Sequence, residues 1–180
     1  MKKIKSLTFV TLLFLLSLLI ISPFIVKIAK AASTGTVAAT VTAQIFSVSL
    51  DNGDGIAFGV IPANSAQDTT TNGVNDSTTA TNNGSVAAKF NIKAVDSTGG
   101  AGWILASSAG SEQFVMKFCT ATCDATPSWT SVGIHPAYAT LAASVAKDGT
   151  QVFDLQIGTP VSTVVTAQQA ITVTVQAVLP

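Results

Sequence analysis

The chain has 180 residues, with nine acidic and nine basic residues and a formal net charge of zero. All nine basic residues are lysines, so the chain has no arginine to clamp a phosphate group bidentately. Five lysines lie in the first 31 residues, which leaves a net charge of −5 on the remainder and argues against nucleic acid as a partner.

The first 31 residues have the features of an export signal. Met1 to Lys5 are basic, Leu7 to Val26 are almost entirely apolar, and Ala29 to Ala31 have small residues at the positions that signal peptidase reads. We expect cleavage before Ala32, which leaves residues 32–180 as one secreted or cell-surface domain. The apolar run is long and Lys27 follows it, so an uncleaved membrane anchor is the alternative.

An alternating apolar pattern begins soon after this site. Apolar residues occupy the odd positions from Val37 to Ile45 and the even positions from Phe46 to Leu50. Because successive side chains of a strand point to opposite faces, the slip by one residue predicts either two strands or one strand with a bulge.

The sequence DNGDG at Asp51 to Gly55 predicts a tight turn, because Asn and Gly tolerate positive φ. Asp51 and Asp54 are also candidate Ca²⁺ ligands, since oxygen ligands in a short Gly-rich loop suit a hard cation. The loop lacks the middle ligand of DxDxDG and the distant glutamate, so we favour the turn and expect no metal or other cofactor.

The next segments alternate between apolar and polar composition. Ile56, Phe58 and Val60 predict a short strand that ends at Pro62. Residues 63–84 are almost entirely polar or small, so we expect a long surface loop that closes in a turn at Asn82-Asn83-Gly84.

Ser85 to Asp96 is the longest segment with a strict two-residue period. Its apolar residues are Val86, Ala88, Phe90, Ile92 and Ala94, and they alternate with Lys89, Asn91 and Lys93. This pattern predicts a central strand with one face in the core and the two lysines in water.

Two cysteines follow another predicted strand. Phe114, Met116 and Phe118 alternate, and Cys119 and Cys123 come directly after them with CxxxC spacing. In an exported chain so close a pair predicts a structural disulfide, and a redox role is the alternative. CxxxC is not the redox sequence CxxC, and no histidine lies beside it in the sequence to lower a thiol pKa.

The C-terminal third adds further strands. Leu141 to Val145 predicts a strand or a helical turn, Lys147-Asp148-Gly149 a reversal, and Phe153 to Ile157 and Ile171 to Leu179 two strands. In total we expect an all-β chain that folds as a single antiparallel β-sandwich, Ig-like or jelly-roll-like, with about eight to nine strands.

The residues do not favour an enzyme. The single histidine, His135, has no partner in sequence and precedes Pro136, which predicts a loop position, and the chain has no GxSxG nucleophile motif. A hydrolase built on a carboxylate pair stays the least favoured class, because spacing in sequence cannot show such a pair.

The segment Val60-Ile61-Pro62-Ala63, the polar stretch after it and NNGSVAAKFNIKAV at Asn82 to Val95 resemble the TasA and camelysin group of exported β-sandwich proteins. The resemblance covers about a quarter of the chain. It implies a jelly-roll-like subunit that polymerises into extracellular fibres by donating an N-terminal strand, here Thr36 to Ala43. This chain departs from the group in its CxxxC and two tryptophans, and it has no metalloprotease motif.

Strand donation also has a physical basis, because an apolar strand can fill an open sheet edge in a neighbouring molecule. The default alternative is that Thr36 to Ala43 pairs within its own sheet.

Among the functional classes, we expect first a fibre or surface-layer subunit whose partner is itself. An adhesion module that binds glycans or other surface proteins is the alternative, and its candidate aromatics are Trp103, Trp129 and Tyr138.

Overall fold

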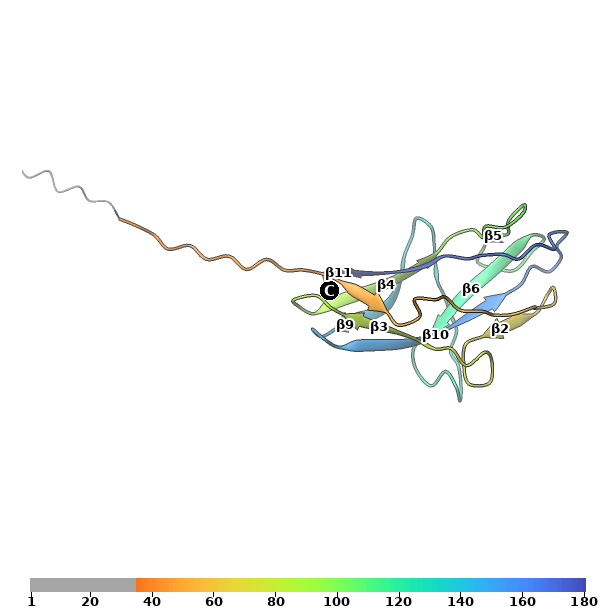
Figure 1. Ribbon diagram of the computed structural model, residues 1–180, viewed down its shortest axis with the longest axis horizontal. Helices are drawn as coiled ribbons and strands as arrows, with labels where there is room; N and C mark the ends of the chain where they lie inside the picture. Colours follow the sequence, from red (N-terminus) through yellow and green to blue (C-terminus); the bar gives the residue numbers. More distant parts are fainter. Residues whose placement is uncertain (1–34) are drawn as a thin grey trace, which may run out of the picture. The chain divides into compact units, whose positions relative to one another are not determined.

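The computed structural model describes residues 35–180, and all of its strands lie in the compact unit Thr42–Pro180 (Figure 1). The predicted signal peptide and its cleavage site at Ala31 and Ala32 lie outside the described residues. The described part is all-β, with eleven strands and no helix. The strands are β1 Val48–Leu50, β2 Ala66–Asp68, β3 Thr78–Asn82, β4 Ala88–Ala94, β5 Ile104–Leu105, β6 Gln113–Cys119, β7 Thr130–Ser131, β8 Gly133–Ile134, β9 Ala139–Val145, β10 Thr150–Gly158 and β11 Val173–Val178.

The strands form two sheets. One has the order β1-β3-β10-β6-β5, with β2 paired to β10 and β7 paired to β6. The other has the order β11-β4-β8, with β9 paired to β4. Two pairs are parallel, β4 with β8 and β5 with β6, so the expectation of a purely antiparallel fold with eight to nine strands was wrong. β5, β7 and β8 have two residues each, too few to show a period in the sequence.

One hydrophobic core is shared by the two sheets. The prediction for β4 is confirmed, because its residues alternate between buried and half-buried positions, with Phe90 and Ile92 fully buried. Phe114 on β6 and Phe153 on β10 bring the other sheet into the same cluster. β6 and β10 lie side by side in Figure 1 and pair antiparallel, with Met116 opposite Ile157.

The expected surface loop over residues 63–84 was wrong, because this segment contains β2 and β3. β3 buries Thr78, Ala80 and Asn82 on one face. The side-chain amide of Asn82 donates to the carbonyls of Val86 and Val145, at 2.9 Å each. A buried polar group is stable when it is hydrogen-bonded, so a strand of polar residues can face the core without an apolar pattern in its sequence.

Two strands predicted near the N-terminus are absent. Residues 35–47 form no strand. Residues 56–61 also form none, although Ile56, Phe58 and Ile61 pack against the core. An apolar alternation becomes a strand only where another strand pairs with it, and no strand within residues 42–180 pairs with residues 56–61.

Candidate functional site

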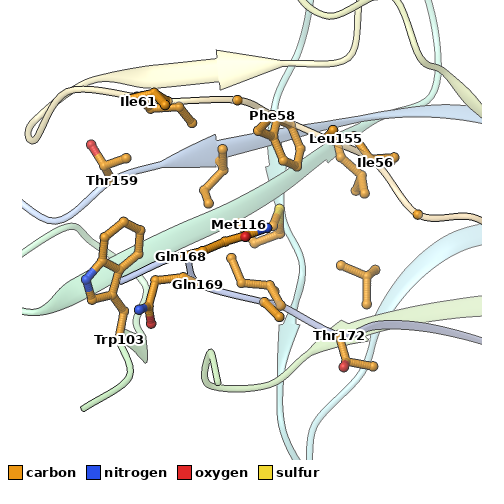
Figure 2. A pocket seen from close by; sticks show the side chains of 18 of the residues that line it. Ile56, Phe58, Ile61, Trp103, Met116, Leu155, Thr159, Gln168, Gln169 and Thr172 are labelled. Carbon is orange, nitrogen blue, oxygen red and sulfur yellow. The ribbon is translucent and has the colours of Figure 1, made fainter. Parts of the chain in front are cut away.

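A groove with a cavity volume of about 1260 Å³ opens between residues 50–63 and residues 163–173. Its floor is apolar and comes from the core faces of β6 and β10, through Met116, Phe153, Leu155 and Ile157. Figure 2 shows Phe58 and Ile61 on one side of this space, Gln168 and Gln169 on the other, and Met116 between them. Apolar side chains of the core therefore lie at the bottom of an open channel.

The first wall of the groove is an extended segment without a backbone partner. No backbone N–H or C=O group from Ile56 to Ile61 makes a hydrogen bond to another residue within 35–180. Val60 is fully exposed, while Ile56 and Phe58 are half-buried and line the groove. Such a row of free backbone groups is what a pairing strand needs.

The second wall is residues 163–172, which lead into β11. Its hydrogen bonds to the rest of the described fold lie at its two ends, while Ala167 and Gln168 pack beside Gly99 and Gly100. At one end Trp103 Nε1 donates to Thr163 Oγ1 at 3.0 Å, and at the other Ser97 Oγ donates to Gln169 Oε1 at 2.6 Å. Across the 35–180 structure, the N–H groups of residues 166–168 have no hydrogen-bond acceptor.

The N-terminal segment is an extended chain with exposed apolar side chains, the kind of segment that could pair with the walls of the groove. Val37 is 93% exposed and Val41 is 96% exposed, and the alternation that places them on one side of an extended chain continues to Ile45. Within residues 35–180, then, one chain carries both an unpaired apolar segment and an unfilled apolar channel.

The candidate Ca²⁺ ligands lie at a turn beside the groove. The Asp51 carboxylate accepts a hydrogen bond of 2.7 Å from the backbone N–H of Thr79, and this bond is the main reason that the pKa of Asp51 lies below its ordinary value of 3.8. Gly53 and Gly55 close the predicted turn through backbone bonds. Among residues 35–180, no three His, Cys, Asp or Glu side chains gather where they could hold a metal ion.

The predicted disulfide is present in the structure. Cys119 and Cys123 are bonded, with 5.8 Å between their Cα atoms, a separation typical of disulfides. The adjacent Asp124 carboxylate accepts hydrogen bonds from the Thr71 N–H at 2.7 Å and the Thr71 hydroxyl at 2.9 Å. The Thr71 N–H is the main cause that lowers the pKa of Asp124 below 3.8. The disulfide loop is thereby tied to the β2–β3 loop.

The other candidate residues do not form a common site. Trp103 lines the groove, whereas Tyr138 lies beneath the Lys93 ammonium, 4.4 Å from Nζ to the ring centre. His135 Nδ1 lies 3.3 Å from the same Nζ atom. Trp129 is not among the residues that line the groove. The three aromatics proposed for an adhesion module thus do not line one groove.

Sequence reasoning identified the apolar alternation from Val37 to Ile45 but missed the groove. The only signal was the weak strand pattern from Ile56 to Val60, whose missing partner cannot be seen in sequence. Comparison of the chain with protein families, with curated proteins and with solved structures found no match. No helix within residues 35–180 is long and apolar enough to cross a membrane. The groove and the N-terminal segment are therefore the features of the molecule that bear on function.

Proposed function

We propose that this protein is a secreted or cell-surface structural subunit that assembles when the segment Thr36 to Ala43 of one copy enters the groove of another. The observation that supports the proposal is the coexistence of an unpaired alternating segment with a groove whose walls have free backbone groups. On this proposal the fold is a jelly-roll-like sandwich that lacks one strand. The disulfide fits the oxidising conditions outside the cell.

The chemistry of the two parts is complementary. The floor residues Met116 and Leu155 are apolar, and Val37 and Val41 would bury their side chains against them. Burial of one valine side chain contributes about 1.5–3 kcal/mol. The backbone of the donated segment would also satisfy N–H and C=O groups of the groove walls, as in other cases where a strand is added to a sheet edge.

The length of the chain between donor and groove favours a donor and an acceptor from different copies. Ile45 is fixed to Ser85 by two hydrogen bonds of 2.9 Å, and β1 then runs to Leu50, which lines the near end of the groove. An extended chain from Ile45 to Leu50 spans about 17 Å. To return over this distance the chain would use about five residues, Gln44 and four of the eight donor residues, so only about half of the donor would be left to enter the groove of its own chain.

Assembly of this kind is open-ended. Each copy gives a segment to one neighbour and receives a segment from another, so the two surfaces in contact are different. A head-to-tail contact of this type produces either a ring or an extending polymer. A fibre or a surface layer is the expected product, and no enzymatic activity is proposed.

The test compares residues 32–180 with a version that lacks residues 32–43, by light scattering and negative-stain microscopy over a range of concentrations. The longer chain should form polymers, and the shorter chain should stay monomeric with an unchanged melting temperature. A synthetic peptide of Thr36 to Ala43 should bind to the shorter chain and block growth of the longer one. Polymers of the shorter chain would rule out strand donation. A longer chain that stays monomeric would favour the adhesion alternative, for which glycan binding is the next assay.

A further inference from the structure

We propose that Glu112 is the positioning residue that holds residues 163–169, hereafter the strap, in the shape that accepts the donated segment. This inference rests on the proposed function, because it concerns the second wall of the same groove. The strap lines the groove through Thr163, Val165 and its following residues. The first wall is held by packing of Ile56, Phe58 and Ile61 on the core, whereas the start of the strap is held by hydrogen bonds to the Glu112 side chain.

The Glu112 carboxylate makes two short hydrogen bonds to the start of the strap. Oε2 accepts from the Thr163 hydroxyl and Oε1 accepts from the Val164 N–H, both at 2.6 Å. Thr163 Oγ1 also accepts the bond from Trp103 Nε1, so the indole depends on the same contact. Hydrogen bonds to a charged acceptor are roughly twice as strong as neutral ones. Glu112 therefore fixes both the strap and the orientation of an aromatic side chain in the groove.

The backbone of Glu112 is also held in an unusual conformation. Its φ is 55°, in the left-handed region that residues other than glycine rarely adopt. The Glu112 N–H donates to Ser162 O at 2.9 Å, and its carbonyl accepts from the Ile104 N–H at 2.9 Å. Conformations of this kind persist only where the surrounding structure imposes them, and they concentrate at functional sites. Here the conformation aims the carboxylate at the strap.

The middle of the strap packs beside Gly99 and Gly100 but makes no hydrogen bond to another element within residues 35–180. At the far end Gln169 accepts from Ser97 Oγ at 2.6 Å and donates to Gly99 O at 2.7 Å. Residues 166–168 are exposed, and their N–H groups have no acceptor within residues 35–180. A segment whose hydrogen bonds to the fold lie only at its ends depends on both of them for a fixed backbone shape. Loss of the Glu112 clamp should therefore leave the wall free to move before the donor binds.

A wall that is already ordered binds more tightly, because the ordering cost has been met during folding rather than at binding. The Glu112→Gln substitution keeps the size of the side chain but removes its charge. It also replaces one acceptor oxygen by an NH₂ group, which cannot accept from the Thr163 hydroxyl or the Val164 N–H. The matched control is Asp124→Asn, since Asp124 accepts one backbone N–H and one threonine hydroxyl in the same manner from a different loop. Asp124 does not line the groove.

The experiment uses the chain of residues 32–180 below its assembly concentration, with a fluorescently labelled peptide of Thr36 to Ala43 as the probe. Hydrogen exchange is measured in parallel. For Glu112→Gln we expect about tenfold weaker peptide binding, faster amide exchange within 163–169, and a shift in tryptophan emission. Asp124→Asn should speed exchange near Thr71 and leave peptide affinity within about twofold. Thr163→Val should weaken binding in the same direction as Glu112→Gln and serves if that variant folds poorly.

The outcomes separate this inference from the proposed function. If wild-type protein binds the peptide and Glu112→Gln binds it equally well, the proposal that Glu112 positions the strap is refuted and strand donation stands. Unchanged exchange across 163–169 in Glu112→Gln would likewise overturn the clamp. If the wild-type protein itself does not bind the peptide, both proposals fall together.

Discussion

Replacement of two valines in the N-terminal segment should abolish assembly without affecting the folded monomer. The change is Val37→Ser together with Val41→Ser. Both side chains are more than nine-tenths exposed in the free chain, so neither contributes packing to the monomer. In an assembled pair both would face the apolar floor of the groove formed by Met116 and Leu155.

The size of the effect follows from this burial. A fully buried valine contributes about 1.5–3 kcal/mol, so loss of two removes about 3–6 kcal/mol from the contact between copies. Each 1.4 kcal/mol changes an equilibrium constant about tenfold. The concentration needed for half-assembly should therefore rise by a factor of about 100 to 10,000. The free energy of unfolding of the monomer should change by less than about 0.5 kcal/mol, as is usual for exposed positions.

The assay is light scattering against protein concentration, with the pellet and supernatant quantified after sedimentation. Denaturant unfolding of each variant at low concentration measures monomer stability. The matched control is Thr36→Ser with Thr40→Ser, which changes the opposite side of the same extended segment. This control should assemble at a concentration close to that of the wild-type protein.

Two results would refute the reasoning. Assembly of the double valine variant at the wild-type concentration would show that these side chains are not buried between copies. A clear loss of monomer stability would show instead that the segment packs on its own domain, against the exposure of Val37 and Val41.

Three further predictions concern stability. Replacement of Cys119 and Cys123 by alanine should lower the free energy of unfolding by about 2 kcal/mol, measured with denaturant, and an unchanged midpoint would contradict a stabilising disulfide. Because the Thr79 N–H lowers the pKa of Asp51, the carboxylate stabilises the fold above about pH 4 and loses this effect as pH falls through the lowered pKa. Melting temperatures between pH 2 and pH 6 should therefore depend less on pH in Asp51→Asn than in the wild-type protein. The same dependence of melting temperature on pH in both proteins would contradict this role of Asp51. Phe90→Ala should cost about 3–5 kcal/mol in denaturant unfolding, because Phe90 is fully buried, and a loss below about 1 kcal/mol would contradict the core.

The elements that were predicted well share one property. β4, β6, β10 and β11 alternate large apolar residues with polar ones over at least five positions, and such a pattern has few other interpretations. Even the choice at Leu141 to Val145 between a strand and a helical turn was decided by pairing, since β9 forms against β4.

The elements that were predicted wrongly depend on their neighbours. β3 was assigned to a loop because its buried residues are Thr78, Ala80 and Asn82, and the burial of Asn82 requires carbonyl acceptors from distant residues. Conversely, residues 56–61 have a strand-like pattern but no strand beside them. A local pattern describes which face is apolar, whereas pairing is a property of two segments.

The sequence by itself determined the all-β class, the core face of the main strands, the close cysteine pair and the apolar alternation from Val37 to Ile45. Only the tertiary structure decided that residues 35–47 form no strand, and that a groove lies between residues 50–63 and 163–173. The physical reason is that a groove is formed by the segments on either side of it, which folding brings together although about 100 residues of sequence separate them.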